Sequence, residues 1–118
     1  MQNISFSSVE LDDSGIPEIS PQEVLQYKDQ VRIIDVRRPD EYTGELGHIE
    51  GAELITLESK FMEFLPTLDA QVTYIFVCRS GARSGQATMM AREQGIEKCY
   101  NMQGGMMAWN ASKLPIVR

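Results

Sequence analysis

The sequence is poor in cysteine. Its 118 residues include two, Cys78 and Cys99, too few for the disulfide framework of a small secreted domain. A chain of this length with 42% hydrophobic residues can instead bury a core of its own as one domain. Free thiols are typical of a reducing compartment, so we expect a cytoplasmic protein.

Positive charge is also scarce. Eleven Lys and Arg against seventeen Asp and Glu give a net charge of −6, which leaves no broad basic surface for nucleic acid or an anionic membrane. No Lys or Arg precedes Lys28, which argues against a secretion signal, and no apolar run is long enough to span a membrane. With no Cys/His grouping, we expect no metal site. We expect no organic cofactor either.

Apolar runs separated by helical segments predict the fold class. Residues 1–15 are polar and Ser-rich, and we treat them as an extension of uncertain order before one domain spanning 16–118. A short apolar stretch opens the domain, and β-branched or apolar runs predict strands at 31–36, 53–55, 72–77 and 98–102. Strands that alternate with helices imply a mostly parallel sheet covered on both faces.

Helix signals fall between these strands. Ser20 can cap a helix whose first position suits Pro21, and Glu23 completes a capping box. Residues 57–65 carry apolar side chains at helical spacing, with Pro66 as the stop. Further helical segments are predicted at 38–42, 84–95 and 104–112.

The segment after the strand at 72–77 carries the strongest functional signal. Cys78 ends this strand, and ligands of parallel sheets bind at the carboxyl ends of strands. The small residues that follow allow backbone N–H groups to converge on one point, and a helix start adds its positive end. Arg79 and Arg83 add full charges, so we expect a lowered thiol pKa and a nucleophilic Cys78. Alternatively, Cys78 is a small core residue, although buried cysteines have no need of two neighbouring arginines.

Three motifs in order resemble the single-domain form of the rhodanese family: "IIDVRRPDEYTGELGHIEGA" (33–52), "CRSGARS" (78–84) and "NMQGGMMAW" (101–109). The resemblance runs from about Ile16 to the C-terminus. It implies an α/β fold with a five-stranded, mostly parallel sheet flanked by helices on both faces. It also implies thiosulfate sulfurtransferase activity through a persulfide on Cys78. The expected substrate-binding residues are Arg79, Ser80, Gly81, Ala82 and Arg83.

The resemblance also suggests the reaction partners. A small anionic donor such as thiosulfate would give its sulfur to Cys78, and cyanide, a thiol or a protein would accept it. A sulfur relay or a regulatory module acting on a protein partner is the alternative, although inactive members of the family generally lack the cysteine. Related phosphatases and arsenate reductases use a Cys-x5-Arg loop, whereas four residues separate Cys78 from Arg83 here. The shorter loop suits a persulfide sulfur better than a phosphoryl group, so phosphatase or arsenate reductase activity is the less favoured alternative.

Asp35, Arg37 and Ser84 are expected to support the site. Asp35 lies in the family's "DVR" signature. It is either a buried carboxylate that fixes the loop or an arginine, or an ordinary ion-pair partner, and the second, structural role is favoured. Arg37 is expected to pair locally with Glu41, with the alternative that it faces the pocket.

Other conspicuous residues are interpreted as structural. His48 belongs to a family turn, and a preformed thiolate needs no general base. Cys99 would lie about three residues, or about 10 Å, below the edge that holds Cys78, too far for a disulfide. Trp109 is expected to pack in the core. Met106 and Met107 could form an apolar pocket wall.

Overall fold

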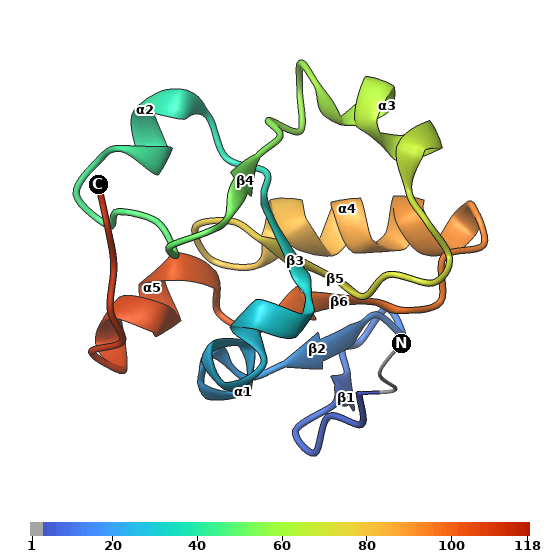
Figure 1. Ribbon diagram of the computed structural model, residues 1–118, viewed down its shortest axis with the longest axis horizontal. Helices are drawn as coiled ribbons and strands as arrows, with labels where there is room; N and C mark the ends of the chain where they lie inside the picture. Colours follow the sequence, from blue (N-terminus) through green and yellow to red (C-terminus); the bar gives the residue numbers. More distant parts are fainter. Residues whose placement is uncertain (1–3) are drawn as a thin grey trace.

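A mostly parallel sheet organises the chain, of which the computed structural model describes residues 4–118 (Figure 1). Its strands are β1 (Glu10–Leu11), β2 (Pro17–Ile19), β3 (Arg32–Asp35), β4 (Glu53–Leu54), β5 (Tyr74–Val77) and β6 (Cys99–Met102). Their spatial order is β1-β2-β6-β5-β3-β4, and every neighbouring pair is parallel except β1 with β2. The predicted α/β sheet is confirmed.

The sheet has six strands where five were expected. The additional strand is β1, which lies in the polar segment before Ile16. Both of its residues are exposed, so no buried apolar pattern marks them in the sequence. Backbone pairing with β2, rather than burial of side chains, holds β1 in the sheet.

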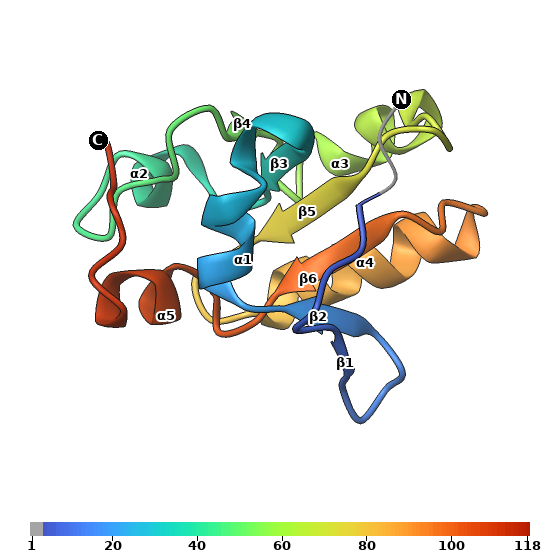
Figure 2. The same cartoon turned by 60° about the horizontal axis from the view of Figure 1, so that its bottom comes forward.

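Helices cover the two faces of the sheet. They are α1 (Pro21–Gln26), α2 (Pro39–Tyr42), α3 (Phe61–Phe64), α4 (Ala82–Glu93) and α5 (Gly105–Ala111), with 3₁₀ turns η1 (Lys28–Gln30) and η2 (Leu65–Thr67). One apolar cluster joins α3 and α4 to the sheet, and a second joins α1 and α5 to the opposite face (Figures 1 and 2). In the part of the chain that the structure describes, no helix is both long and apolar enough to cross a bilayer.

Strand β5 lies at the centre of both apolar layers. Tyr74 and Phe76 point into the cluster beneath α3 and α4, whereas Ile75 and Val77 point toward α1 and α5. Side chains of successive strand residues alternate between faces, so a strand buried on both reads as one continuous apolar run. The same alternation directs Cys78 toward the α4 side.

The helix predicted over 57–65 is wrong in its extent. The structure has a turn in which the N–H groups of Lys60 and Phe61 both donate to the Thr56 carbonyl, and α3 is a single turn. Pro66 does not stop the segment but lies inside η2, near its start, where a missing N–H is no loss. Apolar periodicity alone therefore overstated the regular helix.

The predicted capping box of α1 forms only by half. The Ser20 hydroxyl accepts the Glu23 N–H at 3.2 Å, as expected. Glu23, however, turns away from Ser20 and accepts hydrogen bonds from the backbone and hydroxyl groups of Ser7 and Ser8, and the Ser8 hydroxyl accepts the Ser20 N–H instead. The N-terminal segment thus completes the cap, and its Phe6 packs edge-on against Tyr100.

The start of α5 lies against the loop that follows β5. The N–H groups of Met106 and Met107 donate to the carbonyls of Cys78 and Arg79 at 2.8 and 2.9 Å. A Cβ atom on Gly105, whose φ is +59°, would lie 2.5 Å from the Cys78 carbonyl oxygen. A glycine is required here both for its backbone conformation and for the close approach.

Gly105→Ala is expected to destabilise the protein by about 3 kcal/mol, because a methyl group would clash with backbone atoms of the loop after β5. Gly95→Ala is the matched control: its φ is also positive, at +97°, but its Cβ would meet nothing within 4 Å. That control should cost only the left-handed penalty of about 1–2 kcal/mol. Urea denaturation of both variants measures the difference. Equal losses of unfolding free energy would show that the close contact between Gly105 and the loop does not contribute to stability.

Candidate active site

Cys78 lies at the carboxyl end of β5, at the start of the loop that leads into α4. Its side chain is 1% exposed. The Gly81 N–H donates to its Sγ at 3.1 Å, and the Ser84 hydroxyl lies 3.2 Å from the same sulfur. Gly81 has a φ of +108°, which allows the chain to turn back over Cys78 before α4 begins at Ala82.

These donors set the acidity of the thiol. Burial of Cys78 opposes ionisation and by itself raises the pKa. Hydrogen bonds from the Ser84 hydroxyl and from the backbone N–H groups of Ser84, Gly81 and Ser80 outweigh burial, and the net pKa of Cys78 is lowered. Polar groups of the loop therefore favour a thiolate, which is the nucleophilic form of cysteine.

Arg83 is held by a carboxylate rather than left free in the loop. Its two terminal nitrogens donate to the two oxygens of Glu41 at 2.7 and 2.8 Å. These hydrogen bonds, against a smaller effect of burial, lower the pKa of Glu41 to about 2, and Glu41 likewise raises the pKa of Arg83. The predicted local pairing of Arg37 with Glu41 is therefore wrong for the carboxylate, which binds Arg83 on α4 instead. Arg37 reaches only the backbone carbonyl of Glu41.

Arg37 is instead buried against Asp35. Nε and Nη2 donate to the Asp35 carboxylate at 2.9 and 2.7 Å, and both side chains are 1% exposed. The remaining donors of Arg37 reach the carbonyls of Gly47 and Glu41. Asp35 and Arg37 thus tie the end of β3 to α2 and to the segment beyond it.

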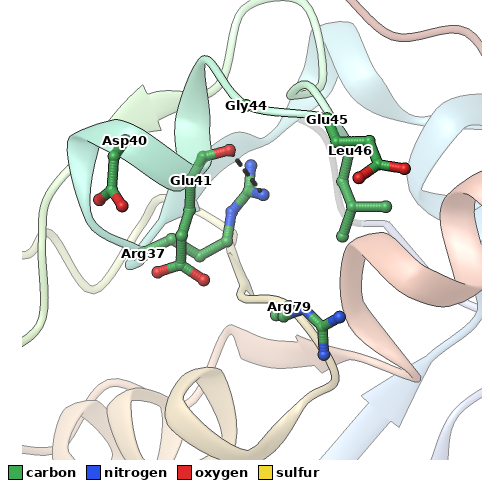
Figure 3. Close-up of a pocket in the computed structure, with 7 residues that line it drawn as sticks. All are labelled: Arg37, Asp40, Glu41, Gly44, Glu45, Leu46 and Arg79. Atoms are coloured by element: carbon green, nitrogen blue, oxygen red, sulfur yellow. Dashed lines mark hydrogen bonds between the residues drawn. The ribbon is translucent and has the colours of Figure 1, made fainter.

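A pocket of about 270 Å³ opens beside the loop, between α2 and Arg79 (Figure 3). It is lined by Arg37, Asp40, Glu41, Gly44, Glu45, Leu46 and Arg79. Met106 and Met107, suggested as an apolar wall, are not among these residues. Arg79 is exposed and, within residues 4–118, has no ion-pair partner, whereas Arg37 and Arg83 each bind a carboxylate.

Asn101 is the residue of this site that the sequence interpretation missed. It lies on β6, is 1% exposed, and accepts a hydrogen bond from the Ser84 hydroxyl. Its amide donates to the Gly81 carbonyl at 3.0 Å and to Glu18 at 3.2 Å. A polar side chain inside the apolar strand "CYNM" was the available signal, because buried polar groups require partners.

The structure separates Cys99, His48 and Trp109 from the thiol of Cys78. Cys99 pairs with Tyr74, four residues before Cys78, which is about 13 Å along the strand and too far for a disulfide. Burial raises the pKa of Cys99 to about 11. His48 stacks on Tyr42, and Trp109 is buried with its N–H on the Pro115 carbonyl.

The comparison with known families agrees with this architecture. The family model described as "Rhodanese-like domain" matches residues 20–112. The chain belongs to the rhodanese-like family. The residues matched include Cys78, its loop and every other site residue described above except Glu18.

Relatives of this rhodanese-like domain include proteins named as sulfurtransferases. The putative sulfurtransferase YtwF of Bacillus subtilis is 39% identical over 85% of this chain and 96% of its own length. The thiosulfate sulfurtransferase GlpE of Pseudoalteromonas translucida is 35% identical over 75% of this chain and 81% of its own. An uncharacterised protein of Synechocystis is 35% identical over 80% of this chain, which spans about half (51%) of that protein. The two relatives named as sulfurtransferases support membership of a sulfurtransferase family.

Solved structures support the fold. A rhodanese-like domain protein of Staphylococcus aureus superposes with a TM-score of 0.71 at 29% identity, covering 86% of this chain and 98% of that one. A rhodanese-related protein of Thermoplasma volcanium gives a TM-score of 0.76 at 23% identity, covering 85% and 96%. At that identity the second likeness concerns the fold alone.

Ser84→Ala is expected to raise the pKa of Cys78 by about one unit, because the thiolate loses a hydroxyl donor and a hydrogen bond to a charged group is worth about 1.5–3 kcal/mol. The rate of iodoacetamide alkylation as a function of pH, with the modified residue located by mass spectrometry, measures this shift. Ser80→Ala is the matched control, because the hydrogen bond from Ser80 comes from its backbone. Similar midpoints for Ser84→Ala and the unsubstituted domain would contradict the assignment.

Glu41→Gln is expected to make the free energy of unfolding fall less steeply as the pH is lowered. Arg83 depresses the pKa of Glu41 from 4.5 to about 2 in the folded protein. The ionised Glu41 carboxylate therefore stabilises the folded protein fully above pH 4.5, and this stabilisation is lost as the pH falls toward 2. Urea midpoints at pH 3 and pH 6 measure it, with exposed Asp40→Asn as the control. An equally steep fall in Glu41→Gln would rule out this ion pair as its source.

Proposed function

We propose that this rhodanese-like domain moves a sulfane sulfur from a small anionic donor to a thiophilic acceptor through a persulfide on Cys78. The observation that carries the proposal is the convergence of the Gly81 N–H and the Ser84 hydroxyl on a sulfur whose pKa is lowered. Stabilised thiolates are nucleophiles near neutral pH. Relatives named as sulfurtransferases supply the reaction class.

The first step would load the sulfur. The Cys78 thiolate attacks the outer sulfur of thiosulfate, a new S–S bond forms, and sulfite leaves with the electron pair of the broken bond. Cys78 then carries a persulfide whose negative charge resides on the terminal sulfur. The exposed guanidinium of Arg79 is suited to the donor's oxyanion, because Arg83 is already neutralised by Glu41.

The second step would release the sulfur. Cyanide or a thiolate attacks the terminal sulfur, and the electron pair of the S–S bond returns to Sγ. The Gly81 N–H and the Ser84 hydroxyl stabilise the thiolate that leaves, as they stabilise the resting one. Both steps proceed without metal or organic cofactor. We place the cycle in a reducing compartment such as the cytoplasm, where the two cysteines stay free.

The test is thiocyanate formation from thiosulfate and cyanide, with intact mass measured on protein treated with thiosulfate alone. We expect turnover and one added sulfur in the unsubstituted protein, and neither in Cys78→Ser. Cys99→Ser, the matched control, should keep both, because Cys99 lies in the core with a pKa of about 11. Turnover in Cys78→Ser would overturn the proposal. An added sulfur without turnover would instead indicate a relay that passes sulfur to a protein acceptor.

The same assay distinguishes the arginines. Arg79→Gln should raise the KM for thiosulfate about tenfold with little effect on the urea midpoint, because an exposed cation that pairs with no carboxylate among residues 4–118 contributes to binding rather than to folding. Arg92→Gln, which removes an exposed arginine from the last turn of α4, outside the pocket lining, is the control. An unchanged KM in Arg79→Gln would exclude it from donor binding.

A further inference from the structure

The Ser84 hydroxyl lies between two acceptors. Its Oγ is 3.2 Å from Cys78 Sγ and 2.5 Å from Asn101 Oδ1. A hydroxyl has a single hydrogen to donate and two lone pairs that accept. Cys78 and Asn101 therefore cannot both receive a full hydrogen bond from Ser84 at the same time.

The orientation of the Asn101 amide is determined by its other neighbours. Nδ2 donates to the Gly81 carbonyl at 3.0 Å and to the Glu18 carboxylate at 3.2 Å. Both partners are acceptors, so a flipped amide would place Oδ1 against two oxygen atoms. Glu18 on β2 and Gly81 thus keep Oδ1 directed at Ser84.

We propose that Asn101 is a positioning residue that competes with Cys78 for the hydrogen of Ser84 and thereby sets the acidity of the thiol. While Cys78 is a neutral thiol, its S–H donates to Ser84 Oγ, and the Ser84 hydrogen is directed to Asn101. When Cys78 ionises, the hydrogen turns to the anionic sulfur, because hydrogen bonds to charged acceptors are the stronger ones. Asn101 Oδ1 then loses its donor, which offsets part of the gain.

The competition has a second consequence that rests on the proposed persulfide. In the persulfide the charge resides on the terminal sulfur, so Sγ becomes a weak acceptor and the Ser84 hydrogen returns to Asn101. Asn101 thus stabilises the sulfur-loaded state relative to the free thiolate. The acidity of the unloaded thiol involves no sulfur transfer and is tested separately from that cycle.

The loop has anchors that do not involve Asn101. The Gly81 carbonyl also accepts the Gly85 N–H at 3.0 Å, and the N–H groups at the start of α5 hold the carbonyls of Cys78 and Arg79. Removal of Asn101 therefore leaves the Gly81 N–H in place beneath Sγ. Its main effect should pass through Ser84.

Asn101→Leu tests this competition, because leucine fills a similar volume, excludes water and offers no acceptor. We expect the alkylation midpoint of Cys78 to fall by about half a pH unit, which gives about threefold more thiolate below both midpoints. Asn101→Ala should shift it in the same direction but less, because water can take the place of the amide. Thr88→Val is the control. Thr88 is buried on α4, the helix that carries Ser84, and makes no hydrogen bond to Sγ, so the midpoint should stay unchanged.

The double variant Ser84→Ala/Asn101→Leu identifies the path of the effect. Without the hydroxyl there is nothing to compete for, so adding Asn101→Leu to Ser84→Ala should leave the midpoint where Ser84→Ala alone puts it. An unchanged or raised midpoint in folded Asn101→Leu would overturn the proposal, as would a fall that persists without Ser84. Alkylation needs no sulfur donor, so loss of sulfurtransferase activity would contradict the proposed function and leave this result intact.

Discussion

The backbone contact between α5 and the loop after β5 is the constraint on which the site depends. The Met106 and Met107 N–H groups hold the carbonyls of Cys78 and Arg79 below the loop, and Gly105 permits the approach. The same loop supplies the Gly81 N–H that donates to Sγ. The C-terminal helix thus shapes a site whose nucleophile is some thirty residues away in the sequence.

Dipoles rather than full charges dominate the surroundings of the thiol. Arg83 and Arg37 are each bound to a carboxylate, so neither offers an open charge to the pocket. The pKa of Cys78 is lowered by a hydroxyl and by N–H groups, which act at contact distance and are little screened by salt. Arg79 alone among these arginines keeps an open guanidinium, so attraction of an anion and activation of the thiol are assigned to different groups.

The sequence predicted those features of the site that depend on residues close together in the chain. The buried run of β5 and the small residues from Ser80 to Ala82 specify a strand end and a tight loop without reference to distant parts of the chain. The partner of Arg83 could not be found in this way, because Glu41 lies 42 positions earlier and a nearer carboxylate would have served equally well by spacing. A polar residue inside an apolar strand marked Asn101 as needing a partner, but its contacts with Ser84 and Gly81 exist only once β6 lies beside the loop.

Strand β1 has a bearing on self-association. Exposed edges of sheets are templates for pairing with other chains, and short, charged edge strands weaken that tendency. β1 ends the sheet on one side with two exposed residues, one of them Glu10, and β4 ends the other side with two residues, of which Glu53 is bound to Arg32. A second molecule would find at either end only a few backbone groups with which to form an intermolecular sheet, so the sheet is built to resist growth into aggregates.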